Sequence, residues 1–63
     1  MHMLGRIERH LRRFNVAPTR FGRDAVGDPR LVIDLRNGRE PGPRMTERIA
    51  RFMDRREAEA SAE

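Results

Sequence analysis

The sequence contains no cysteine, no tryptophan, no tyrosine and no lysine. Without cysteine, neither a disulfide bond nor a cysteine-ligated zinc site can stabilise so short a chain. No apolar run approaches the roughly 20 residues that a membrane-spanning helix needs, and no segment resembles a secretory signal. These absences predict a small domain that is held together by packing alone and has no membrane partner.

The chain of 63 residues is long enough for one domain only. A domain of this size buries about 60% of the surface of its unfolded chain, so its core is thin and scarcely holds a pocket. The one serine lies near the C-terminus, the two histidines lack metal-ligand spacing, and the five glycines form no phosphate-binding loop. We therefore expect a protein that is not an enzyme and that uses no cofactor and no metal.

Positive charge is the main compositional excess, with a net charge of +4 and fourteen arginines against ten acidic residues. Guanidinium groups match phosphates and guanine edges, so an arginine-rich chain is typical of nucleic-acid binding. Codon usage in a GC-rich genome is an alternative explanation for arginine in place of lysine, but it does not explain a positive total. The composition indicates an anionic partner.

Apolar residues recur at helical spacing along the chain, and no two segments alternate as paired strands would. Asn15, Gly27 and Gly38 are suited to end helices, Pro18 is suited to begin one, and Thr46 is suited to cap the last helix. These signals predict an all-α fold of four helices, over residues 3–14, 18–26, 29–37 and 46–57, or five if the tail adds one. Residues 58–63 have no large side chain to anchor them and are expected to fray, which leaves a domain over 1–57.

Residues 30–36 are open to two interpretations. Adjacent Val32 and Ile33 suit a strand, and the Asn-Gly pair that follows suits a hairpin turn. The next residues include two prolines and cannot supply a return strand. We therefore predict a helix that begins at Pro29, directly after the capping residue Asp28.

One apolar core is predicted to join the four helices. Its expected members are Leu4, Ile7, Leu11, Phe14, Val16, Phe21, Ala25, Val32, Leu35, Ile49, Phe52 and Met53. Leu31 and Ile33 cannot both face this core, so one of them is expected to be exposed. His10 is expected at the surface or half-buried, and the arginines of the first and last helices are expected to form solvated faces.

The middle of the chain carries a spaced pattern of small and apolar residues. Phe21 and Gly22 place an apolar residue before a small one, Val32 follows ten residues after Gly22, and Leu35 comes three residues later. An Asn-Gly-Arg triplet closes the segment at 37–39. This pattern resembles the lambda repressor-like (Cro/C1-type) helix-turn-helix family, and the resemblance covers about residues 4–54.

The resemblance implies that the helix over 29–37 is a recognition helix that enters the major groove of DNA. Arg30 would then bind guanine, Ile33 would touch a thymine methyl group, and Asp34 would either accept from cytosine or hold Arg30 in place. The remaining family-matched positions would bind the phosphate backbone, and they are Thr19, Arg20, Asn37, Arg39 and Arg44. Arg23 is a further candidate for DNA binding.

By this resemblance the chain is expected to be a cytoplasmic, nucleoid-associated transcriptional regulator of bacterial or phage origin, such as a repressor, that binds double-stranded DNA. A homodimer on a palindromic site is expected, because one small domain contacts few base pairs. Two alternatives stay open. The same fold could bind a protein partner, such as a polymerase, phage or toxin protein, or it could bind DNA without sequence preference.

Overall fold

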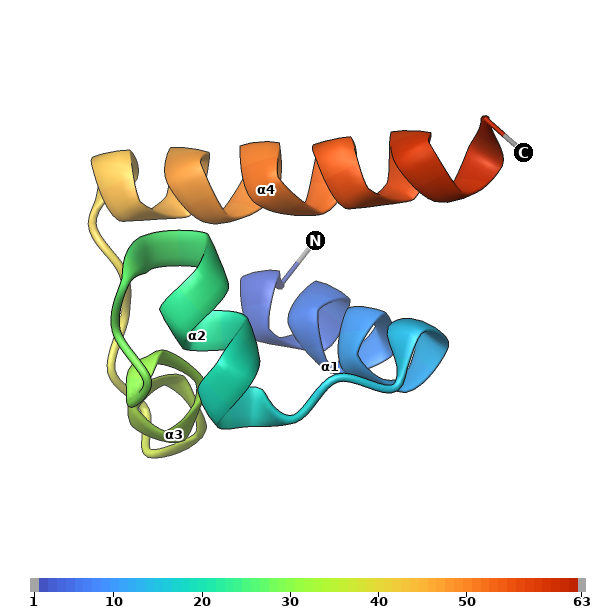
Figure 1. Cartoon of the computed structure of the whole chain (residues 1–63). Coiled ribbons are helices and arrows are strands. Elements are labelled where there is room, and N and C mark those ends of the chain that lie inside the picture. Colours follow the sequence, from blue (N-terminus) through green and yellow to red (C-terminus); the bar gives the residue numbers. More distant parts are fainter. Residues whose placement is uncertain (1, 63) are drawn as a thin grey trace.

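The computed structural model describes residues 2–62, and these form four helices and no strand (Figure 1). They are α1 (Met3–Phe14), α2 (Pro18–Val26), α3 (Leu31–Arg36) and α4 (Pro43–Ser61). The long helix α4 lies along one side of the molecule, and α3 lies on the side away from it (Figure 1). The prediction of an all-α fold is confirmed. Within the described part of the chain, no helix is both long and apolar enough to cross a membrane.

Left-handed residues end the first two helices at the positions that the sequence indicates. Asn15 has a φ of 53°, which lets the N–H of Val16 donate to the carbonyl oxygen of Leu11 at 3.0 Å. Gly27 has a φ of 73° and ends α2 in the same region of backbone space. The bounds of α1 and α2 therefore agree with those expected from the sequence.

The helix α3 is shorter than the predicted helix over 29–37, because the turn that leads into it is not α-helical. The N–H of Leu31 donates to the carbonyl oxygen of Asp28, three residues back, at 3.1 Å. The Asp28 carboxylate accepts the N–H of Arg30 at 2.9 Å. Asp28 thus caps this tight turn, and the α-helix itself begins only at Leu31.

The other end of α3 is closed by Gly38, whose φ is 94°. This conformation lets the N–H of Arg39 donate to the carbonyl oxygen of Asp34 at 3.1 Å, which satisfies one of the last carbonyls of the helix. The helix therefore ends one residue before the predicted Asn37, which serves as its C-terminal cap.

The helix α4 extends beyond the predicted range of 46–57 at both ends. Pro43 occupies its first turn, where the missing N–H has no acceptor to lose, so Thr46 lies inside the helix instead of capping it. At the other end, alanine, glutamate and arginine favour the helical state and carry it to Ser61. The expected frayed tail over 58–63 is therefore helical through most of the part that the structure describes.

The core lies between all four helices. Its buried side chains are Ile7, Leu11, Phe21, Leu31, Val32, Leu35, Ile49 and Met53. Leu31 is the apolar residue that the predicted core lacked. Leu4, Val16, Ala25 and Phe52 are half-buried and pack against it, and Phe14 is half-buried as well.

His10 is buried, with 3% of its surface exposed, so the expectation of a surface or half-buried residue is wrong. Its ring centroid lies 4.6 Å from that of Phe14, 5.3 Å from Phe21 and 6.3 Å from Phe52. Aromatic pairs at these distances stabilise the contact between α1, α2 and α4. The periodicity that marks Ile7 and Phe14 as core also includes His10, three residues after the first and four before the second.

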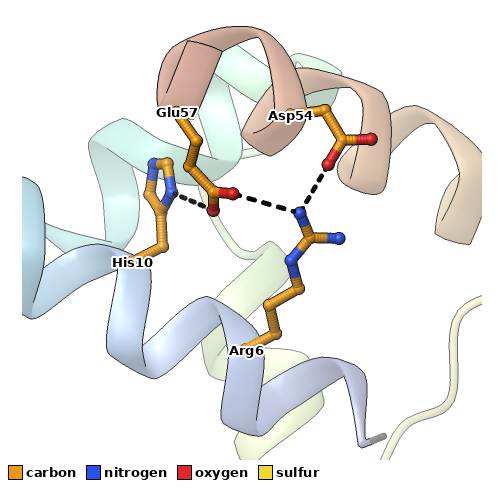
Figure 2. Close-up of polar contacts among 4 residues, drawn as sticks. All are labelled: Arg6, His10, Asp54 and Glu57. Atoms are coloured by element: carbon orange, nitrogen blue, oxygen red, sulfur yellow. Dashed lines mark hydrogen bonds and ion pairs between the residues drawn. The ribbon is translucent and has the colours of Figure 1, made fainter. Parts of the chain in front are cut away.

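A polar cluster beside His10 joins α1 to the C-terminal half of α4 (Figure 2). The Arg6 guanidinium lies 2.6 Å from Asp54 and 3.4 Å from Glu57. The other oxygen of Glu57 lies 3.8 Å from Nδ1 of His10. Burial is the main influence on the imidazole and lowers the pKa of His10, although the nearby Glu57 acts in the opposite direction. Arg6 is thus an inter-helix partner and not part of a purely solvated face.

Candidate nucleic-acid interface

The helices α2 and α3 pack closely because Gly22 has no side chain. A Cβ atom at this position would collide with the carbonyl oxygen of Asp28 and would lie 3.1 Å from Cβ of Leu31. Figure 1 shows α3 nearly end-on while α2 lies across the view, so the two helices cross steeply. Gly22 therefore lets the connecting turn and the start of α3 lie directly on α2.

Only one side of α3 is available to a ligand. Its buried side consists of Leu31, Val32 and Leu35. Arg30, Ile33 and Asn37 lie on the opposite side, since they follow one another at spacings of three and four residues. Ile33 is 39% exposed and is the one exposed large apolar side chain among residues 2–62. The structure thus decides which of Leu31 and Ile33 faces outward.

Asp34 lies at the edge of this outward face and contacts Arg39, three residues after the end of the helix. Its carboxylate lies 3.4 Å from the guanidinium of Arg39, whose side chain is 76% exposed. The pairing of Asp34 with Arg30, which the sequence left open, is therefore not observed; the main-chain N–H of Arg30 instead bonds to Asp28. Arg39 is held beside the exit of α3 by a weak, exposed ion pair.

Arg36 points away from the outward face of α3. Its guanidinium donates two hydrogen bonds to the Glu8 carboxylate of α1, at 2.7 and 2.8 Å. These hydrogen bonds lower the pKa of Glu8 and raise the pKa of Arg36. This bidentate pair connects residues 28 positions apart and links α3 to α1 at the surface.

Three candidate residues lie on α2. Thr19, Arg20 and Arg23 are all exposed. Arg20 lies 3.6 Å from Asp24 of the same helix, so its charge is partly compensated. No side chain caps the first turn of α2, where the amide groups of Thr19 and Arg20 point out of the helix end. Uncapped amides of this kind are able to donate to an anion.

The predicted helix bounds place the ninth candidate, Arg44, in the loop before the last helix, and this prediction is wrong. Arg44 occupies the first turn of α4 and is exposed there. The structure therefore groups the candidates into the outward side of α3 with its exit, the exposed side of α2, and a separate position on α4. Among residues 2–62, no group of three or more histidine, cysteine, aspartate or glutamate side chains could hold a metal ion.

Comparisons with protein-family models, with curated proteins and with solved structures found no match to this chain.

Proposed function

We propose that this chain is a small DNA-binding regulator whose helix α3 enters the major groove of duplex DNA. The observation that carries this proposal is the division of α3 into two sides. Leu31, Val32 and Leu35 anchor the helix on α2 and the core, while its opposite side presents Arg30 and Ile33 to solvent. A short, rigidly seated helix with hydrogen-bonding side chains is what major-groove readout requires.

Each exposed residue suits a particular part of a DNA duplex. Arg30 can donate two hydrogen bonds to O6 and N7 of guanine, and Ile33 suits a thymine methyl group. Asn37 and Arg39 lie at the exit of α3, where they can donate to phosphates of one strand. Thr19 and Arg23 lie on the exposed part of the adjoining helix α2 and can do the same.

The charges around α3 favour an anionic ligand modestly. Arg23 and Arg30 form no side-chain ion pair with any residue between 2 and 62, and Arg39 forms only an exposed one. Of the three acids at and beside α3, Asp28 bonds to a main-chain N–H and Asp34 lies beside Arg39, whereas Glu40 is exposed and forms no ion pair with any residue between 2 and 62. Uncompensated arginines next to a recognition surface increase the rate and affinity of DNA binding.

A fluorescence titration of selected and random duplexes tests this proposal. Arg30→Ala should cost about 1–3 kcal/mol at the preferred site and relax the base preference at one position. Arg39→Ala should instead weaken binding to every duplex and reduce the salt dependence. Absence of DNA binding at about 50 mM salt would contradict the proposal, and equal affinity for unrelated duplexes would identify a binder without sequence preference.

We further propose that two copies act together on a palindromic site, because one short helix reads few base pairs; their half-sites would lie about 34 Å apart. An interface between the two copies through the outward face of α4 is disfavoured, because that face is rich in arginine and would oppose like charges. Sizing of the protein with and without a palindromic duplex tests whether two copies bind one site. A complex with a single copy on its preferred site would contradict this proposal.

Binding of a protein partner is the second candidate function. Ile33 is the one large apolar side chain that is exposed among residues 2–62, and it lies on the outward side of α3. An exposed apolar side chain on this side of the helix favours a protein contact. Ile33→Ala would then abolish capture of the partner, whereas Arg30→Ala would leave it unchanged.

A further inference from the structure

A row of arginines follows the outward side of α4. Its four members, called the arginine row here, are all exposed: Arg44, Arg48, Arg51 and Arg55. Spacings of four, three and four residues keep them within about 60° of the helix circumference, along about 16 Å of its length. Ile49 and Met53 occupy the opposite, buried side of the same helix.

Most of the charge in this row is not compensated. Arg51 pairs with Glu47 at 2.7 Å. Arg44, Arg48 and Arg55 have neither an ion pair nor a side-chain hydrogen bond with any residue that the structure describes. A helix face that is merely solvated usually alternates charges of both signs, which supports the helix through local pairs. The arginine row departs from that pattern.

Apart from Glu47, which pairs with Arg51, the acidic residues of α4 contact arginines outside the row. Asp54 and Glu57 contact Arg6 of α1 (Figure 2), and Glu59 lies 3.7 Å from Arg56. On the α2 side, Asp24 borders the row beside Arg48 and Arg55, and this acid lies 3.6 Å from Arg20. Glu47 and Asp24 therefore flank the row, but neither pairs with Arg44, Arg48 or Arg55, and a linear surface with an excess of positive charge remains.

We propose that the arginine row binds the phosphate backbone of a DNA duplex without regard to sequence. Its length excludes contact of all four side chains with one small anion, whereas a duplex offers one phosphate for about every 1.7 Å of its axis. Guanidinium forks suit phosphate oxygens, and arginines in a row along one helix face provide charge but little base recognition.

The position of the row gives this binding a consequence. The helices α4 and α3 lie on opposite sides of a molecule that measures 22 Å across its shorter axes (Figure 1). A duplex on the arginine row therefore leaves α3 accessible to a second duplex. One copy of the chain would then bridge two DNA segments; this bridging rests on the proposed function of α3, whereas binding to the row does not.

The first test measures the affinity for unrelated duplexes as a function of salt. The variant R48Q/R55Q removes two charges from the row and keeps the helix propensity of its positions. The logarithm of the binding constant falls linearly with the logarithm of the salt concentration, and we expect the steepness of this line to decrease by about 0.9 for each phosphate that the variant no longer neutralises. The variant R48K/R55K keeps the charges and should retain the slope. The control R12Q/R13Q removes two exposed charges from α1 and should also retain it.

Circular dichroism and urea titration establish that each variant is folded. An equal fall in slope for R48Q/R55Q and R12Q/R13Q would overturn the inference, because net charge alone would then govern binding. An unchanged slope in R48Q/R55Q would overturn it as well, and would leave an acidic protein as the partner for the row.

The second test measures bridging, as the capture of a fluorescent duplex by a bead-bound duplex in the presence of the protein. We expect capture by the natural sequence and its loss in R48Q/R55Q and in R30A/R39A. If R48Q/R55Q loses bridging and R30A/R39A keeps its affinity for DNA, the proposed role of α3 is contradicted, and the proposed role of the arginine row is not. Full bridging by R48Q/R55Q would overturn the inference and would indicate two copies joined through another surface.

Discussion

Gly22 of α2 lies directly against the main-chain carbonyl oxygen of Asp28, and nothing larger than a hydrogen atom fits between them. This contact brings the turn before α3 onto α2 and places Leu31 in the core. The orientation of the proposed DNA-reading helix therefore depends on the absence of a single methyl group.

Gly22→Ala is expected to destabilise the protein by about 1–3 kcal/mol, because the added methyl group must push the backbone of Asp28 away from α2. The midpoint of urea denaturation measures this loss. The matched control is Gly5→Ala, since Gly5 lies in α1 with open space around its missing Cβ. That variant should gain up to about 1 kcal/mol from helix propensity, and an equal effect at both glycines would contradict the assigned contact.

The two sides of α3 should differ sharply in their contribution to stability. Leu31 is 5% exposed, and Leu31→Ala should cost about 2–5 kcal/mol, enough to unfold much of so small a domain. Ile33→Ala removes a similar side chain from the outward side and should change stability by about 0.5 kcal/mol or less. Urea denaturation curves of the two variants, recorded under the same conditions, measure the two stability losses. A large loss at Ile33 would mean that α3 is rotated about its axis.

Stability should fall as the pH falls below the ordinary pKa of histidine, which is 6.5. Burial lowers the pKa of His10 in the folded state, so in this range the unfolded chain takes up a proton that the folded protein does not. The contribution is absent above the ordinary value, where the imidazole is neutral in both states. Glu57 faces the ring and Arg6 and Arg56 lie near it, and together they adjust the effect.

The measurement is the urea midpoint at a series of pH values between about 7.5 and 5, which brackets the ordinary pKa of histidine. His10→Leu should abolish the dependence on pH in this window, whereas His2→Leu, at an exposed position, should retain it. A midpoint in the natural sequence that does not change across the window would show that His10 is not buried as a neutral side chain.

The pair between Glu8 and Arg36 should be visible in the titration of the carboxylate. Hydrogen bonds from Arg36 lower the pKa of Glu8 below its ordinary value of 4.5, so the pair stabilises the fold above that pH and loses its contribution as the pH falls through the lowered value. Arg36→Gln should raise the pKa of Glu8, as measured by NMR. Arg39→Gln, which alters the neighbour of Asp34 instead, should leave the Glu8 titration unchanged.

Local signals in the sequence determined the helical class and most helix ends. Asn15, Gly27 and Gly38 end helices because a left-handed residue terminates a helix by its own backbone angles, without regard to what lies around it. The periodicity of apolar residues likewise defined most of the core. Where such signals competed, as at the first turn of α3 or at Pro43, the predicted bounds were wrong by two or three residues.

Only the tertiary structure decided what the charged residues contact and which side of α3 faces outward. Arg6 meets Asp54 across 48 residues of sequence and Arg36 meets Glu8 across 28, so neither pair has a local signal. The burial of His10 and the exposure of Ile33 depend in the same way on how helices far apart in the chain pack together. The fourteen arginines were evident from composition alone. Packing decides which of them pair between helices, as Arg6 and Arg36 do, and which remain exposed on the outward sides of α3 and α4.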